Sequence, residues 1–472
     1  MASMNKGDET NKDFKSKFLS DAEIAKEKLD TISPSFCLAK WKQVSLHLPT
    51  GLNNSCYHPP LHEIPAETLK NNPSALHNTR EKKEIRKLMM QGKKPDECQY
   101  CWKMESNGNL SDRHYRSGEP WASKDFDVIV KNPSKDITPS YVEVNFNNAC
   151  NLKCSYCSPQ FSSTWMSEIK DLGAYPTSTP HNALEHFVGS RLPIPHSQEN
   201  PYVDAFWEWW PELYKELEHF RMTGGEPLMD KNTYKVFDYV LENPKSNLHL
   251  NVTSNLSVTD ALWNKYLDYV KLLCTGKIEH FMQYVSVDTW GTQAEYIREG
   301  LDFDLLWKRV HQFLEEVPSY SSITFIITMN NLSVSNLNKL MEGILELRKT
   351  YSKDFQRVWF DTPVLTTPSW QSMQLLSEPY VMKLNSIKDW MNDNLETEDD
   401  LYHGFKDYEV KRLERDIKWM QEPLGNEYVN NQKADFYKFF TESDKRHSKD
   451  FIATFPEMSE WWNECKFYAL SK

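Results

Sequence analysis

The residues best suited to chemistry are three cysteines, Cys150, Cys154 and Cys157, in the segment CNLKCSYC directly after a strand-like run. Thiolates are good metal ligands, and the Cys-x3-Cys-x2-Cys spacing brings all three onto one short loop. They can ligate three irons of a four-iron four-sulfur (4Fe-4S) cluster and leave the fourth iron open for chemistry. Structural zinc is the alternative, although zinc usually takes four protein ligands and no fourth Cys or His lies close to this trio in sequence.

This segment resembles the signature of the radical S-adenosylmethionine (SAM) enzymes, including the aromatic Tyr156 before the last cysteine. In that family the open iron binds the amino and carboxylate groups of SAM, and an electron from the cluster cleaves SAM to a 5'-deoxyadenosyl radical. The resemblance implies Cys150, Cys154 and Cys157 as catalytic metal ligands, Tyr156 in the SAM site, and an electron donor such as flavodoxin or ferredoxin. The implied reaction is hydrogen abstraction by an enzyme of oxidoreductase or transferase type.

A Gly-Gly-Glu-Pro sequence, which contains Gly224, Gly225 and Glu226, follows a predicted strand. Two glycines let the backbone approach a ligand closely, and a carboxylate can accept a hydrogen bond from an ammonium group. Taken alone, this sequence is typical of a turn. It is similar to the family motif that binds the amino end of SAM, and the resemblance implies that role here.

Three further residues resemble the remaining SAM contacts of the family. Asn255 ends the sequence Thr-Ser-Asn and is similar to a strand end that holds the ribose, although the same residue types also cap helices. Ser286 and Arg298 match a Ser-x-Asp and downstream Arg pattern that contacts the methionyl carboxylate. A guanidinium group suits a carboxylate, whereas an Arg in a helical stretch is more often a surface residue.

The elements that must position these residues are strands that alternate with helices from residue 136 to 375. Such alternation predicts parallel strands with right-handed crossovers, and active-site residues at the carboxyl ends of the strands, where the motifs fall. We therefore predict an α/β fold with a partial (β/α)6 TIM-like barrel of the radical SAM type. Hydrophobic periodicity predicts strands at 140–146, 219–223, 247–253, 280–287, 323–328 and 357–361, and helices at 232–241, 259–273, 304–316 and 337–348.

Four more cysteines, Cys37, Cys56, Cys98 and Cys101, precede the predicted barrel. Their number satisfies either a closed iron-sulfur cluster or structural zinc, and spacing alone does not separate the two. The form Cys-x13-Gly-x4-Cys resembles the first half of the twitch or SPASM modules that hold auxiliary four-iron clusters in many radical SAM enzymes. In those modules the cysteines usually follow the barrel. The resemblance implies an auxiliary iron-sulfur cluster bound by these four residues.

The composition is that of a globular enzyme of the cell interior. Hydrophobic residues make up 39% of the chain, and no apolar stretch has the length that a membrane span needs. The polar first residues lack an apolar signal core, so we expect a cytoplasmic protein, in which nine cysteines favour metal or catalytic thiols over disulfides. With 67 acidic and 55 basic residues, the net charge of -12 gives no general attraction to nucleic acid or membrane.

We expect four parts along the chain: a polar N-terminal tail at 1–30, a twitch-like auxiliary module at 31–135, the barrel at 136–375, and a helical C-terminal segment at 376–472 that caps the barrel or recruits substrate. Because auxiliary modules are common among peptide-modifying members of the family, the resemblance favours a peptide or protein substrate. Radical modification of a nucleotide or nucleic acid is one alternative. A non-catalytic, zinc-stabilised binding protein is the other.

Overall fold

The computed structural model describes residues 11–187, 192–195, 198–318 and 320–471. The chain is mixed α/β with a parallel-strand sheet. It divides into two compact units, which are described separately: a first unit of residues 1–147, 193–224 and 245–251, and a second unit of residues 148–192, 225–244 and 252–472.

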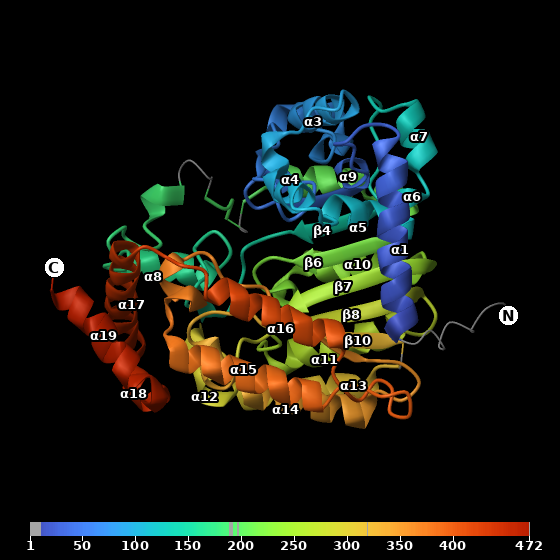
Figure 1. Ribbon diagram of the computed structural model, residues 1–472. Coiled ribbons are helices and arrows are strands. Elements are labelled where there is room, and N and C mark those ends of the chain that lie inside the picture. Colours follow the sequence, from blue (N-terminus) through green and yellow to red (C-terminus); the bar gives the residue numbers. More distant parts are fainter. Residues whose placement is uncertain (1–10, 188–191, 196–197, 319, 472) are drawn as a thin grey trace. The chain divides into compact units, whose positions relative to one another are not determined.

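The first unit combines a sheet with short helices. Its strands are β1 (Gln43–His47), β2 (Leu52–Asn54), β3 (His62–Glu63), β4 (Tyr141–Asn145), β6 (His219–Thr223) and the first residues of β7 (Lys245–Ser254). Its helices are α1 (Asn11–Asp30), α2 (Ala39–Lys42), α3 (Arg80–Met90), α4 (Gln99–Ser106), α5 (Asp112–Gly118), α6 (Pro120–Ser123), α7 (Phe126–Lys131) and α9 (Pro201–Glu216). Helix α1, drawn in blue, packs against α5 (Figure 1).

The strands of the first unit follow the order β7-β6-β4-β1-β2-β3. β1, β4 and β6 are parallel neighbours, whereas β2 and β3 run antiparallel in hairpins. Val142 and Val144 of β4 are fully buried, and Tyr141 and Glu143, which alternate with them, are partly exposed, because alternate side chains point to opposite faces of a sheet. A separate core includes Phe36, Trp41, Trp121 and three of the cysteines.

The second unit contains the end of β7 and the strands β8 (Ile278–Ser286), β10 (Ser321–Ile326) and β11 (Val358–Asp361), in that order. β8, β10 and β11 are parallel. A second, two-stranded sheet pairs β5 (Lys153–Cys154) with β9 (Arg298–Glu299). The helices are α8 (Ser163–Leu172), α10 (Lys231–Glu242), α11 (Asp260–Leu273), α12 (Gly291–Ile297), α13 (Phe303–Glu316), α14 (Leu337–Tyr351), α15 (Glu378–Asp393), α16 (Asp407–Met420), α17 (Asn426–His447), α18 (Phe451–Thr454) and α19 (Ser459–Leu470).

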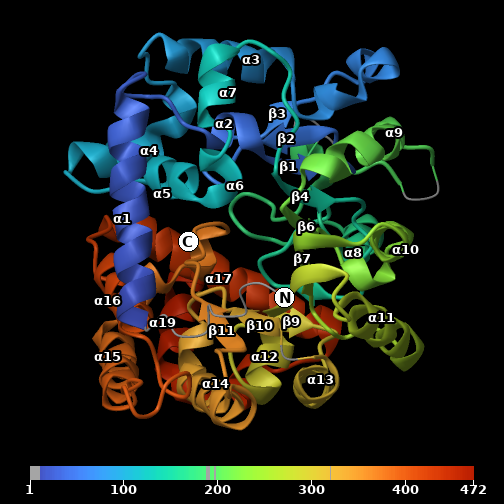
Figure 2. The same ribbon diagram turned by 90° about the vertical axis from the view of Figure 1, so that its right-hand side faces the viewer.

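Local signals explain where these helices begin. Thr259 and Asp302 accept hydrogen bonds from the backbone at the first turns of α11 and α13, which satisfies donors that have no partner inside the helix. Helices α13 and α14 pack against β10 and β11 (Figure 2). At the end of the chain, α17 and α19 lie side by side (Figure 1).

All six strands and all four helices predicted between residues 136 and 375 are present as β4, β6, β7, β8, β10 and β11 and as α10, α11, α13 and α14. The predicted parallel pairing is confirmed for β4 with β6 and for β8, β10 and β11. The segment predicted as a polar tail forms α1 from residue 11 onward. None of the described helices has the length and apolar character needed to cross a membrane.

Candidate cofactor and metal sites

The three cysteines of the opening motif lie on one loop of the second unit, just before α8. All three are free thiols and partly exposed. Hydrogen bonds to neighbouring elements hold the loop: the indole of Trp165 donates to the carbonyl of Cys154 at 3.0 Å, and the amide of Asn182 donates to that of Cys157 at 3.1 Å. The backbone N–H of Cys150 donates to the Ser163 hydroxyl at the start of α8 at 3.1 Å. The loop therefore has a defined conformation around its thiols.

The electrostatics of this loop disfavour three unbound thiolates. Burial raises the pKa of all three thiols, to about 12 for Cys157, and the charge of Cys154 adds to the rise at Cys150 and Cys157. Bound iron would relieve both effects, because a metal stabilises the thiolate form directly. In this respect the donor set fits an iron-sulfur cluster.

Within the described residues, no group of three or more Cys, His, Asp or Glu side chains is arranged to hold a single metal ion. A four-iron cluster makes a different demand on its ligands. Each thiolate binds a different iron, so the three sulfurs need not converge on one point.

Arg298 reaches the cysteine loop because β9 pairs with β5, which places Arg298 opposite Cys154. Its Nη1 lies 3.5 Å from the Cys154 sulfur, while Nε and Nη2 each donate to Asp288 at 2.9 Å. The Tyr156 hydroxyl also donates to Asp288, at 3.0 Å. Burial would lower the pKa of Arg298, but the effects of Asp288, Tyr156 and Cys154 together raise the pKa above its usual value, so the guanidinium stays charged.

Asp288 is the residue of this site that the sequence reasoning missed. It is fully buried and also accepts a hydrogen bond from the backbone N–H of Thr328 at 3.1 Å. The Ser-x-Asp pattern that singled out Ser286 was the available signal. Ser286 itself is partly exposed at the end of β8, and among the described residues no hydrogen bond joins it to Arg298.

Glu226 is almost fully buried, at 2% exposure, and its carboxylate connects two segments of the second unit. One oxygen accepts from the backbone N–H of Leu228 at 3.0 Å and from the Ser254 hydroxyl at 2.8 Å, and the other accepts from the backbone N–H of Asn255 at 2.8 Å. Burial raises the pKa of Glu226 to about 7, against the opposing effect of these hydrogen bonds. The carboxylate thus ties the Gly-Gly-Glu-Pro loop to the end of β7.

The same two segments also contact the cysteine loop. The backbone N–H of Glu226 donates to the carbonyl of Ala149 at 2.6 Å, and the amide of Asn255 donates to Asn151 at 3.0 Å. A Cβ on Gly225 would lie 2.2 Å from that Ala149 oxygen, so only glycine permits this approach. Glycine thus permits close contact between this loop and the cysteine loop, and the close approach to a ligand stays a prediction.

Gly224 belongs to the first unit, at the end of β6. Its φ of +119° lies in a region that L side chains rarely adopt, and a Cβ there would lie 2.1 Å from the side-chain oxygen of Asn145 on β4. Glycine is thus required at this position for two independent reasons.

The four earlier cysteines line one cavity of the first unit. Cys37, Cys98 and Cys101 are buried, and Cys56 is partly exposed. Burial raises the pKa of each thiol, to about 11 for Cys56 and about 12 for Cys98 and Cys101. Residues spread over 65 positions of sequence therefore meet at one place, as a shared ligand set requires.

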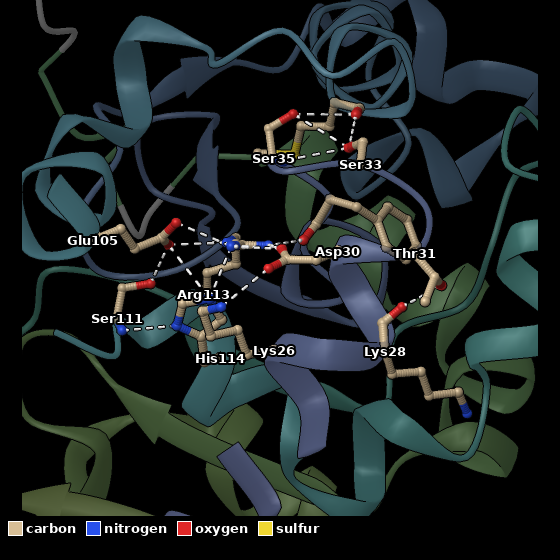
Figure 3. Close-up of polar contacts among 12 residues, drawn as sticks. Lys26, Lys28, Asp30, Thr31, Ser33, Ser35, Glu105, Ser111, Arg113 and His114 are labelled. Carbon is tan, nitrogen blue, oxygen red and sulfur yellow. Dashed lines mark hydrogen bonds and ion pairs between the residues drawn. The ribbon is translucent and has the colours of Figure 1, made fainter. Parts of the chain in front are cut away.

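Two buried cations, Lys40 and Arg113, also line this cavity, and each is fixed by carboxylates. Lys40 pairs with Glu97. Figure 3 shows that Arg113 lies between Glu105 and Asp30. Its Nε donates to Glu105 at 2.9 Å, and its Nη1 donates to Asp30 at 3.3 Å. Positive charge beside four thiols offsets the negative charge that bound thiolates bring.

No protein-family model and no curated protein sequence matches this chain. Among solved structures, SuiB of Streptococcus suis bound to precursor peptide SuiA is similar at 13% identity with a TM-score of 0.34, over 60% of this chain and 52% of SuiB. SuiB bound to S-adenosylmethionine is similar at 13% identity with a TM-score of 0.34, over 67% of this chain and 59% of SuiB. A spore photoproduct lyase mutant, with bound S-adenosylmethionine and dinucleoside spore photoproduct, is similar at 11% identity with a TM-score of 0.27, over 64% of this chain and 92% of the lyase.

In the first of these comparisons the chain spans about half the length of SuiB.

Proposed function

We propose that this protein is a radical SAM enzyme. Cys150, Cys154 and Cys157 would hold a four-iron four-sulfur cluster with one iron open to SAM. When bound, the cluster would supply the electron that splits SAM into methionine and a 5'-deoxyadenosyl radical, which abstracts hydrogen from the substrate. The substrate class that we propose is a peptide or protein.

One observation carries this proposal: three segments that resemble SAM-binding motifs all contact the cysteine loop. Glu226, Asn255 and Arg298 each lie within hydrogen-bonding distance of residues 149–154. A turn, a helix cap and a surface arginine that matched the motifs by coincidence would have no reason to meet at one loop. Their convergence supports a common ligand above the cysteines.

The proposed roles follow from the chemistry of each group. Gly224 and Gly225 would let the backbone approach the amino end of SAM, and Asn255 would bind the ribose. Ser286 and Arg298 would bind the methionyl carboxylate.

Three side chains, among them the proposed cofactor-binding residues Tyr156 and Glu226, would also hold this site in shape. Asp288 and Tyr156 fix the plane of the Arg298 guanidinium through the hydrogen bonds described above. Glu226, with both oxygens engaged by this chain, would hold the loop and the strand end at a fixed separation. Such preorganisation means that the groups need not reorient when SAM binds.

The test is reduction of the anaerobically reconstituted full-length chain with dithionite in the presence of SAM. We expect 5'-deoxyadenosine to form. Cys154→Ala should reduce it to background, because one cluster ligand is lost. Cys274→Ala, which removes an isolated and fully buried thiol, is the matched control and should retain the product. A fully loaded cluster that yields no 5'-deoxyadenosine would refute the proposed chemistry.

We further propose an auxiliary iron-sulfur cluster in the cavity of Cys37, Cys56, Cys98 and Cys101. The wild-type chain should then bind about eight irons with equal labile sulfide, and a variant without the catalytic trio should keep about four. The double variant Cys98→Ala with Cys101→Ala should lose the four irons of the auxiliary cluster and keep those of the catalytic cluster. Zinc without labile sulfide at this cavity would assign structural zinc instead.

The substrate class can be tested without knowing the substrate. A lysate fraction that contains the substrate should stimulate 5'-deoxyadenosine formation, and protease digestion of that fraction should remove the stimulation. If nuclease removes it and protease does not, the substrate is a nucleic acid and the peptide assignment is wrong.

A further inference from the structure

Helix α17, in the C-terminal segment, contacts the cysteine loop through a buried carboxylate on α8. Lys153, which lies between Cys150 and Cys154, donates to Glu168 at 2.6 Å. His447, the last residue of α17, lies 2.9 Å from the same Glu168 oxygen and 3.1 Å from the Lys153 ammonium group. Three elements far apart in sequence therefore meet at one carboxylate.

The second oxygen of Glu168 is also engaged. The Tyr175 hydroxyl donates to it at 2.5 Å, and the Arg446 guanidinium lies 3.5 Å away while it stacks over the Tyr175 ring. Glu168 is only 7% exposed. Burial would raise its pKa, but the hydrogen bonds from His447, Lys153 and Tyr175 lower it well below its usual value, so the group remains a carboxylate.

The partner strand of the cysteine loop is held by the same part of the chain. Lys153 on β5 is paired in register with Glu299 on β9, and Glu299 forms an ion pair with Lys449, two residues after the end of α17. Lys449 also donates to the carbonyl of Glu295 at 2.9 Å. Just before β9, the Tyr296 hydroxyl donates to Asp444 of α17 at 2.6 Å. Both strands of the β5–β9 pair are therefore attached to α17 and its C-terminal end.

We infer that the end of α17 is a positioning element of the cofactor site, and that Glu168, His447 and Lys449 hold the β5–β9 pair in register. This pair carries Cys154 and Arg298 opposite each other, so its register sets the distance from a cluster ligand to the guanidinium. The inference deepens the proposed function and rests on it for the cluster. It assigns this face of the C-terminal segment to the support of the cysteine loop, in place of substrate recruitment.

The charges give the physical reason. Glu168→Gln keeps the size of the side chain and an oxygen for Tyr175, but it leaves the Lys153 ammonium beside His447 without the carboxylate that holds both. Unpaired, partly buried charge is unfavourable, so Lys153 will turn toward water and the β5 strand will loosen. Residues that orient metal ligands typically change metal affinity about 10-fold to 100-fold when mutated.

The first experiment uses the cluster-loaded full-length chain. Iron release to a chelator should be about 10-fold faster in Glu168→Gln than in the wild type. Glu342→Gln, which changes an exposed glutamate on α14, is the matched control and should release iron at the wild-type rate. The electron paramagnetic resonance spectrum of the reduced cluster with SAM should also shift in Glu168→Gln, which a loss of general stability would not cause. Wild-type iron release and an unchanged spectrum would overturn the inference.

The second experiment uses the metal-free chain, so that it remains decisive if the cluster proposal fails. Amide hydrogen exchange of a peptide covering residues 150–157 should be about 10-fold faster in both Glu168→Gln and Lys449→Gln, because local opening of the strand pair becomes easier. Lys445→Gln, which alters a lysine of α17 whose side chain is 81% exposed, should exchange like the wild type. Unchanged exchange in both variants would reject the positioning role, whereas failure of the wild type to bind iron would reject only the proposed cluster.

Discussion

The substitution Asp288→Asn tests the geometry of the proposed SAM site most directly. Asp288 accepts two hydrogen bonds from Arg298, one from Tyr156 and one from the backbone of Thr328, and its side chain is fully buried. Asparagine has the same shape, so the change removes the charge and one acceptor oxygen with little change in volume. Arg298, whose side chain is 7% exposed, then keeps a buried positive charge without its partner.

The expected cost follows from that burial. Removal of one partner from a buried ion pair typically costs 3–5 kcal/mol, and we expect about 3 kcal/mol here because the asparagine oxygen can still accept one bond from Arg298. Asp260→Asn is the matched control. Asp260 also pairs with a buried arginine, Arg309, at 2.6 Å, but its own side chain is 85% exposed and water can replace it. Its loss should cost about 1 kcal/mol or less.

The measurement is urea unfolding of the metal-free chain, with the free energy of unfolding compared between the two variants. The double variant Asp288→Asn with Arg298→Gln should be more stable than the sum of the single changes predicts, by about 1 kcal/mol or more, since it leaves no unpaired charge. If Asp288→Asn and Asp260→Asn are equally stable, Arg298 is not held by Asp288, and the reasoning about a fixed guanidinium beside Cys154 is wrong.

Three further predictions concern other parts of the second unit. Gly225→Ala forces a Cβ to 2.2 Å from a backbone carbonyl and should lower stability by about 1–3 kcal/mol in thermal unfolding, whereas Gly425→Ala, with nothing within 4 Å, should stay within about 0.5 kcal/mol. Burial lowers the pKa of His181 from 6.5 to about 4, so as the pH falls the unfolded chain binds this proton before the folded chain does, and the free energy of unfolding decreases below about pH 6.5. In urea unfolding, the wild type should lose about 1 kcal/mol more of its free energy of unfolding than His181→Phe between about pH 7.5 and 5.5. Glu409→Gln breaks a fully buried ion pair with Arg348 and should lower the free energy of unfolding in urea by about 3 kcal/mol. A decrease smaller than the one caused by breaking an exposed ion pair would contradict the burial argument.

The sequence predicted the strands well because their side-chain alternation is a local property. β6 has the predicted bounds, and β7, β8 and β10 differ from theirs by a few residues at each end. The position of the motif residues at strand ends could also be predicted, since parallel strands place their carboxyl ends at one edge. The need for glycine at position 225 is visible in the motif, and the structure explains it by the close Ala149 carbonyl of the cysteine loop.

The supporting contacts could not be predicted because they join residues far apart in sequence. Asp288 lies 132 positions from Tyr156, and Lys153 lies 294 positions from His447. No local pattern of residue types specifies such pairs. No sequence pattern indicated the roles of Glu168 and α17. Asp288, in contrast, is part of the Ser-x-Asp pattern, from which only Ser286 was assigned a role.

The two groups of cysteines share an electrostatic arrangement that neither motif contains. In the second unit, Arg298 and Lys153 approach the cysteine loop, and each is bound by a carboxylate from another element. In the first unit, Lys40 and Arg113 line the cavity of four cysteines, again with carboxylate partners. Neutral thiols supply no countercharge, so a buried cation beside them needs a carboxylate partner, and each of these cations has one. Beside metal-bound thiolates each cation would also attract the thiolates, an attraction that its carboxylate partner reduces. If the two proposed clusters bind at these cysteines, removal of a cation should weaken metal binding at its own site and leave the other site unchanged.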